Sequence, residues 1–246
     1  MTLYLNPDLT PEEVHKAAKA GIRGIKSYPR GVTTNSDSGI ESYTVYYEIF
    51  RAMEEAGMVL NLHGEIPSDP SNDICVLNAE ERFLEHLAKL HADFPGLKIV
   101  LEHATTKAAV DMVKSLGPTV GCTITVHHLQ LLVDDWAGQC HHFCKPVAKF
   151  PHDRDALREV VRQGHPRFFL GTDSAPHPRF SCQFGRMFYG VGSNTLPRQT
   201  ITLIKCEADS DSKMLVPQEI PFVDDDMVQR SIVPFWAGKA LTWRIQ

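Results

Sequence analysis

The chain has 246 residues, of which 43% are hydrophobic and 22% charged, a composition typical of one folded domain with a sizeable core. A formal net charge of -5 argues against a nucleic-acid partner. The sequence has no uninterrupted apolar run of membrane-spanning length and no signal-peptide pattern at its start, so no membrane association is predicted. The six scattered cysteines are typical of reduced thiols, and a cytoplasmic location is expected.

Short apolar runs alternate with longer amphipathic stretches along the chain, the pattern of βα units around a parallel sheet. Six strands are predicted, at Thr2–Leu5, Ile22–Tyr28, Met58–His63, Lys98–His103, Val120–Thr125 and Arg167–Asp173. The predicted helices between them are Thr10–Ala20, Ser42–Ala56, Asn78–Phe94, Thr106–Leu116 and Asp153–Gln163. No clear strand is predicted between Pro176 and Gln218, and Ile232–Ile245 is expected to pack back on the body.

Parallel strands joined by helices form either an open, doubly wound sheet or a closed barrel. None of the predicted strands is followed by a glycine-rich phosphate-binding loop, so the phosphate-binding function that is usual for an open sheet is not indicated. The predicted fold class is therefore α/β, an incomplete TIM (β/α)8-type barrel with about six of its eight strands.

Polar side chains stand at the C-terminal ends of four predicted strands: Lys26, His63, His103 and Asp173. In a (β/α)8 barrel this end carries the active site, so these side chains are expected to converge there. Imidazole and carboxylate are ligands that Zn²⁺ prefers. The position of these four residues at the ends of separate strands therefore predicts a zinc site.

Each of these residues also has a structural alternative. A single histidine at a strand end is more often structural, Lys26 can extend its ammonium to solvent, and Asp173 can cap a helix. The presence of all four residues at corresponding strand ends favours the metal site over these structural alternatives. His127 and His128 also fall at this end, where at most one of them would point inward from an extended chain. The group Cys140–Cys144 lacks the second ligand pair of a zinc finger.

Several longer motifs resemble the dihydroorotases, the monofunctional bacterial and fungal type within the amidohydrolase superfamily. The motifs that carry the resemblance are Lys26–Pro29, Thr33–Ser36, Leu62–Glu65, Glu102–Lys107, Gly171–His177 and Val233–Gly238, and they occur in the family's order.

The resemblance implies a two-zinc hydrolase that interconverts N-carbamoyl-L-aspartate and L-dihydroorotate in pyrimidine synthesis. Lys26 matches a lysine that is carboxylated by CO2 and bridges the metals, and His63 and His103 match histidine ligands. Asp173 matches the catalytic aspartate, which also binds metal. The resemblance further implies that His177, Thr33 and Thr34 contact the substrate or close over it, and that the protein is a homodimer.

The sequence departs from the family at two places. It lacks the His-x-His pair, arginine and asparagine of the first strands, and the segment after His177 is short, so residues 1–246 are expected to form one barrel domain truncated at its N-terminus. One zinc, or none, is then an alternative to two. Two further alternatives are a catalytically impaired remnant or incomplete gene product, and an amidohydrolase for another cyclic amide.

Overall fold

The computed structural model describes residues 2–33, 36–139 and 142–173, and four short strands beyond them. The chain divides into two compact units, one of Met1–Ala137 with Lys145–Gly171 and one of Gly138–Cys144 with Thr172–Gln246. The prediction of one barrel domain over residues 1–246 stays a prediction. None of the helices described here is both long and apolar enough to cross a bilayer.

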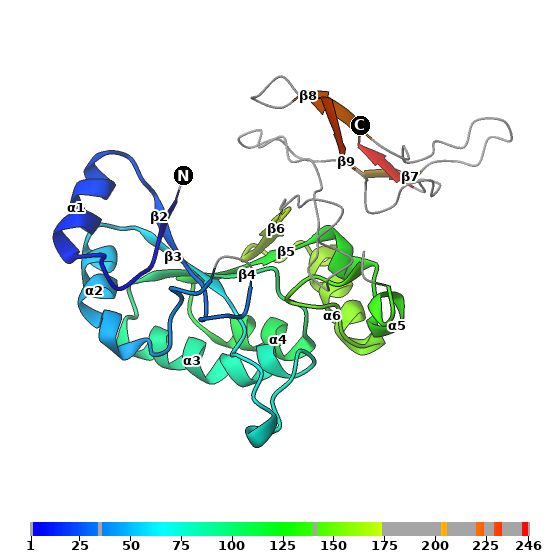
Figure 1. The fold of residues 1–246 in the computed structure, drawn as a ribbon, viewed down its shortest axis with the longest axis horizontal. Coiled ribbons are helices and arrows are strands. Elements are labelled where there is room, and N and C mark those ends of the chain that lie inside the picture. The colour runs from blue at the N-terminus through cyan, green and yellow to red at the C-terminus, as the bar shows by residue number, and fades with distance from the viewer. Residues whose placement is uncertain are drawn as a thin grey trace, which may run out of the picture. The chain divides into compact units, whose positions relative to one another are not determined.

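The first unit is built on a six-stranded parallel sheet (Figure 1). Its strands lie in chain order: β1 (Thr2–Tyr4), β2 (Gly24–Ser27), β3 (Val59–His63), β4 (Lys98–Glu102), β5 (Val120–Ile124) and β6 (Phe168–Leu170). Parallel crossovers are right-handed, so an order that never reverses places the connecting helices on one face of the sheet. A doubly wound sheet reverses its order and carries helices on both faces. The observed order is therefore that of a barrel wall.

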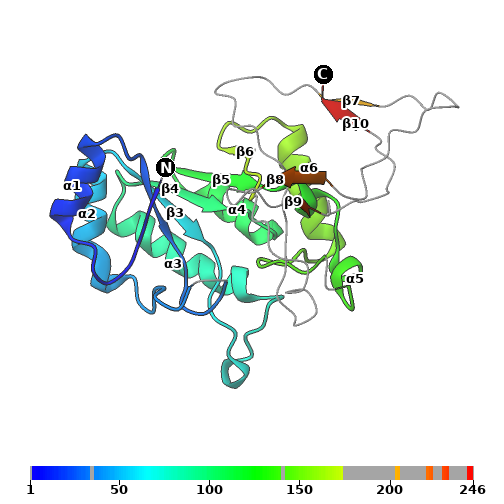
Figure 2. The same ribbon diagram turned by 45° about the horizontal axis from the view of Figure 1, so that its top comes forward.

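Helices follow one another along the outside of this sheet (Figures 1 and 2). They are α1 (Pro11–Lys19), α2 (Tyr47–Glu55), α3 (Ala79–Asp93), α4 (Lys107–Ser115), the short α5 (Val133–Trp136) and α6 (Pro151–Arg162), with 3-10 turns at Thr44–Tyr46, Pro70–Asn72 and Val126–Leu129. Side-chain caps mark the starts of α1 and α4, because the hydroxyl of Thr10 accepts from the Glu13 N–H and that of Thr106 from the Ala109 N–H.

The observed starts of two helices differ from the predicted starts by more than one residue. The stretch predicted as one helix from Ser42 begins as a 3-10 turn at Thr44–Tyr46, where β-branched and aromatic residues disfavour an α-helix. The last helix begins at Pro151, two residues before its predicted start, because proline suits the first helical position and the Asp153 carboxylate accepts the Phe150 N–H.

The core lies between the sheet and the helices. Alternate strand residues such as Leu60, Leu62, Ile99 and Leu101 are at most 1% exposed, and they pack with fully or almost fully buried helix residues including Phe50, Met53, Phe83, Leu87 and Val113. Because successive strand residues point to opposite faces, the face away from these leucines carries Lys26, Asn61, His63 and Glu102, which the strand register pairs.

The second unit contains two short antiparallel pairs. Strand β7 (Leu203–Lys205) pairs with β10 (Trp243–Ile245), and β8 (Ile220–Val223) pairs with β9 (Gln229–Ile232). Strand β7 falls in the stretch where no clear strand was predicted, since three residues are too few to display an alternating pattern. The expected packing of Ile232–Ile245 on the body stays a prediction.

Candidate functional site

Lys26 is the next-to-last residue of β2 and lies on the face opposite the leucine core. The strand register aligns Lys26 with Asn61 on β3 and His63 with Glu102 on β4, so these side chains share one face. Lys26 is 8% exposed, and its ammonium contacts the Glu102 carboxylate and lies 4.9 Å from the centre of the Tyr28 ring. The ion pair and the ring together balance a buried positive charge.

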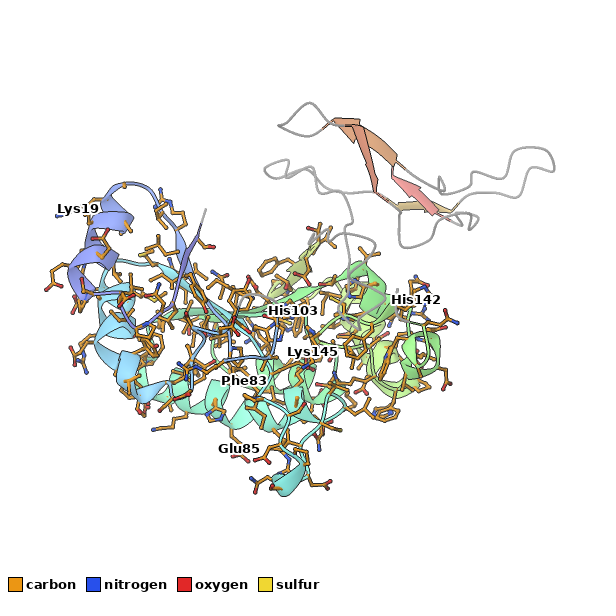
Figure 3. The ribbon with its side chains drawn as sticks, in the orientation of Figure 1. Lys19, Phe83, Glu85, His103, His142 and Lys145 are labelled. Atoms are coloured by element: carbon orange, nitrogen blue, oxygen red, sulfur yellow. The ribbon has the colours of Figure 1, made fainter. Side chains whose placement is uncertain are left out.

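His63 and His103 come from neighbouring strand ends and meet edge to face, with 4.7 Å between ring centres. His63 is the last residue of β3, whereas His103 follows β4 with a left-handed backbone at φ 47°. Few non-glycine residues adopt this conformation, and it occurs often at functional sites. The His103 N–H donates to the Thr123 hydroxyl on β5 (2.7 Å), which fixes the turn. Figure 3 shows His103 within the body of the protein, whereas Lys19 and Glu85 lie on its outside.

The surroundings of His103 hold its imidazole neutral. Burial lowers the pKa of His103 well below its ordinary value, and electrostatic interactions with the nearby His63 and Lys26 lower it further. In the described part of the chain, its buried Nδ1 atom has no hydrogen-bond partner. A neutral imidazole with an unpaired nitrogen is the form that binds a metal ion.

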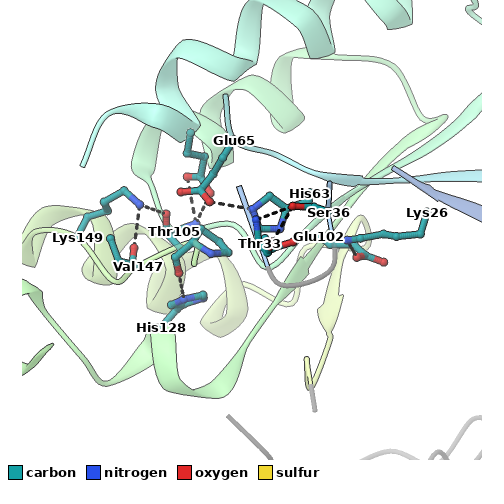
Figure 4. Close-up of polar contacts among 12 residues, drawn as sticks. Lys26, Thr33, Ser36, His63, Glu65, Glu102, Thr105, His128, Val147 and Lys149 are labelled. Atoms are coloured by element: carbon teal, nitrogen blue, oxygen red, sulfur yellow. Dashed lines mark hydrogen bonds and ion pairs between the residues drawn. The ribbon is translucent and has the colours of Figure 1, made fainter. Parts of the chain in front are cut away.

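A second set of buried polar groups lies beside His63 (Figure 4). One oxygen of Glu65 lies 2.8 Å from His63 Nε2, and both side chains are at most 2% exposed. Burial alone would raise the pKa of Glu65, but the hydrogen bond with His63 and the charge of Lys149 bring it below its usual value. Glu65 is therefore ionised at neutral pH.

Lys149 and Glu80 extend this buried set, linked through Thr105. Figure 4 shows the contact of Lys149 with Thr105. The Lys149 ammonium donates to the Thr105 hydroxyl (3.0 Å) and to the Val147 carbonyl (2.8 Å). The Thr105 N–H donates to the Glu80 carboxylate at the start of α3. These bonds hold the segment after β4 against α3 and against the chain before α6.

The donor set at this end of the sheet fits a zinc ion. Two imidazoles in contact and a lysine close enough to act electrostatically on His103 stand at three adjacent strands. Within the described residues, no three His, Cys, Asp or Glu side chains gather as metal ligands, so a three-donor site here depends on Lys26.

Of the other predicted site residues, the structure describes Asp173 and Thr33. Asp173 comes three residues after β6, has φ 46° and belongs to the second unit, so its meeting with Lys26 stays a prediction. Thr33 lies in a turn, where its N–H donates to Ser36 Oγ (3.0 Å) and its carbonyl accepts from that hydroxyl (2.7 Å). Thr34 and His177 lie outside the described residues.

Both histidines of the pair His127–His128 are buried, at 3% and 2% exposure. They lie in a 3-10 turn with ring centres 4.1 Å apart, so the assumption of an extended chain was wrong. The expectation that at most one of them points inward stays a prediction. His128 Nε2 donates to the Pro146 carbonyl (2.9 Å). His128 also interacts electrostatically with His103, so the two side chains lie near each other.

Sequence reasoning missed Glu65, Glu102 and Lys149. Glu65 and Glu102 stand inside the quoted motifs Leu62–Glu65 and Glu102–Lys107, and two glutamates next to strand-end histidines were the available signal. Lys149 is 47 residues beyond Glu102 in the sequence, and no local pattern indicates its burial.

Comparison with known proteins defines the class of this fold and site. Residues 3–117 match the family model described as Amidohydrolase. The crystal structure of dihydroorotase in complex with 5-fluoroorotic acid from Saccharomyces cerevisiae is similar with a TM-score of 0.85 and 37% identity, covering 100% of this chain and 79% of that one. The fold is thus an α/β barrel of the amidohydrolase type, and the predicted fold class is confirmed.

Sequence relatives narrow the class. A probable dihydroorotase from Schizosaccharomyces pombe is 57% identical over 99% of this chain and 78% of the relative. Dihydroorotase from Mycosarcoma maydis is 71% identical over 72% of this chain, an alignment that spans 45% of the relative. The chain belongs to the dihydroorotase family, which confirms the resemblance stated from the motifs.

Proposed function

We propose that this chain is a metal-dependent cyclic amide hydrolase that interconverts N-carbamoyl-L-aspartate and L-dihydroorotate. The observation that carries the proposal is the meeting of Lys26, His63 and His103 at one end of three adjacent strands, in a chain that belongs to the dihydroorotase family. Pyrimidine synthesis in the cytoplasm, as a homodimer, is the setting that we propose with it.

His63 and His103 are the proposed nitrogen ligands, because both are buried and His103 is held neutral. Lys26 is the proposed third ligand as a carbamate, formed when its neutral amine bonds to the carbon of CO2 and releases one proton. The chemistry that bound zinc supplies in such a site is polarisation of the amide carbonyl and activation of water near neutral pH. One ion or two remain alternatives for the metal content.

Asp173 is the proposed general base and acid. In the ring-opening direction, its carboxylate accepts a proton from the attacking water as the new carbon–oxygen bond forms. It then delivers that proton to the ring nitrogen as the carbon–nitrogen bond breaks. Ring closure reverses these transfers and releases water. Thr33, Thr34 and His177 are proposed to hold the substrate, with His177 on its carboxylate.

The test is ring closure of N-carbamoyl-L-aspartate by the purified chain in the presence of zinc and bicarbonate. We expect turnover by the unaltered protein and its loss in Lys26→Ala. The matched control is Lys98→Ala, which removes an exposed lysine at the opposite end of β4 and should retain full activity. Loss of activity in both variants, or in neither, contradicts the role of Lys26.

Hydantoin and dihydrouracil, assayed in parallel, test the substrate. Opening of either ring without conversion of N-carbamoyl-L-aspartate would assign the chain to another cyclic amide. A folded, zinc-loaded chain that converts none of the three would indicate an impaired remnant and overturn the proposal.

A further inference from the structure

The carboxylate of Glu65 contacts one ring nitrogen of His63, Nε2. Glu65 lies two residues after His63 and is 1% exposed, and its Oε2 lies 2.8 Å from His63 Nε2. A neutral imidazole in contact with a carboxylate oxygen donates its single N–H to that oxygen, so Nε2 carries the proton in this contact. In this tautomer Nδ1 carries no proton, and its lone pair is left for another partner.

Glu65 also differs from the neighbouring buried glutamate, Glu80. Both are 1% exposed. Glu80 accepts the Thr105 backbone N–H with both oxygens, at 2.8 and 3.1 Å, and so anchors a loop. In the described part of the chain, Glu65 Oε1 has no hydrogen-bond partner, and the one side-chain bond of Glu65 is to His63. A carboxylate that served only to anchor the loop would be expected to satisfy both oxygens.

Lys149 supplies a positive charge that offsets the free-energy cost of burying the Glu65 carboxylate. It is 2% exposed and held by the Thr105 hydroxyl and the Val147 carbonyl, close enough to act electrostatically on Glu65. A buried carboxylate without such a partner would be strongly disfavoured. The arrangement keeps a negative charge directly against His63.

We infer that Glu65 is a positioning residue that fixes the tautomer and ring orientation of His63, presenting the Nδ1 lone pair as a ligand for zinc. The inference rests on the proposed function, since it takes His63 to be a metal ligand. A carboxylate on the far nitrogen of a ligating histidine raises the ligand's basicity, and removing such a partner typically weakens metal binding by about 10–100-fold.

The first test is zinc affinity, measured by competition with a chromophoric chelator at constant pH. We expect Glu65→Leu to bind zinc about 10–100-fold more weakly than the unaltered chain. Glu65→Gln should recover part of the loss, because the amide oxygen still accepts the Nε2 proton. Glu85→Leu is the control, since it removes an exposed carboxylate on the outside of α3, and its zinc affinity should be unchanged.

The second test needs neither metal nor activity. In the metal-free chain with ¹⁵N-labelled histidine, long-range ¹H–¹⁵N spectra should show His63 protonated on Nε2, with the signal assigned by its loss in His63→Ala. The same tautomer is expected in Glu65→Gln. An Nδ1-protonated His63 in the unaltered chain would overturn the inference, even if Glu65→Leu fails to fold.

His63→Ala tests the proposed metal site separately from the proposed role of Glu65. If this variant binds zinc as well as the unaltered chain, His63 is not a ligand and the proposed metal site fails. If His63→Ala loses affinity while Glu65→Leu does not, the metal site stands and the role of Glu65 is refuted.

Discussion

Acid should destabilise the first unit through His127. This side chain is 3% exposed, and burial lowers its pKa from 6.5 to about 4. Because the folded-state pKa lies below that of the unfolded chain, the unfolded state binds more protons between about pH 6.5 and pH 4. The stabilisation that depends on a neutral His127 is therefore complete above this range and is lost as the pH falls through it.

The magnitude follows from proton linkage. At pH 5 an unfolded histidine is almost fully protonated, whereas His127 in the folded chain is almost fully neutral. The free energy of unfolding should therefore be about 2 kcal/mol lower at pH 5 than at pH 8 from this residue alone. His103 and His128, whose pKa values are also lowered by burial, add losses of the same sign.

The assay is urea denaturation at pH 8 and pH 5, for the unaltered chain and for His127→Leu. We expect the difference in unfolding free energy between the two pH values to shrink by about 2 kcal/mol in the variant. Leu131→Ala is the control, because it removes buried apolar contacts without removing a titratable group and should lower stability equally at both pH values. The same pH dependence in His127→Leu and the unaltered chain would refute the reasoning.

Two further changes test the framework around the site. Arg167 donates to the carbonyls of Leu116 (2.8 Å) and Gly117 (3.0 Å) at the end of α4. Arg167→Ala should therefore lower the free energy of unfolding, measured by urea denaturation, by about 2–3 kcal/mol. A decrease below about 0.5 kcal/mol would show that water replaces these bonds. A Cβ added at Gly39 would lie 2.6 Å from the Tyr28 carbonyl oxygen. Gly39→Ala should therefore shift the loop that carries Thr33 and raise the KM for N-carbamoyl-L-aspartate, and an unaltered KM would contradict this.

The sheet was predictable because each strand is a short apolar run between clear helix signals. Predicted and observed bounds of β3 differ by one residue, and those of β4 and β5 differ only by the last residue. The prediction that Lys26, His63 and His103 form one site rests on the same pattern, because carboxyl ends of parallel strands share one edge. The structure brings the His63 and His103 rings into contact. Strand order in turn distinguished a barrel wall from a doubly wound sheet.

The buried charges were not predictable in the same way. Lys149 reaches the loop after β4 from 44 residues beyond Thr105, and no periodicity in the sequence records such a contact. The backbone of His127–His128 was also missed, since a short 3-10 turn leaves no clear pattern in the sequence. Both errors concern tertiary packing, which decides the environment of a polar side chain more than its neighbours in the sequence do.

The unbroken strand order has a consequence for how this region folds. Lys26, His63 and His103 belong to three successive βα units, so each strand meets its neighbour after closing a loop that contains a single helix. Lys26 and His63 are 37 residues apart and His63 and His103 are 40 apart, and the entropy cost of closing a loop rises only slowly with its length. A chain leaving the ribosome can therefore bring all three side chains together once the segment from β2 to α4 has emerged.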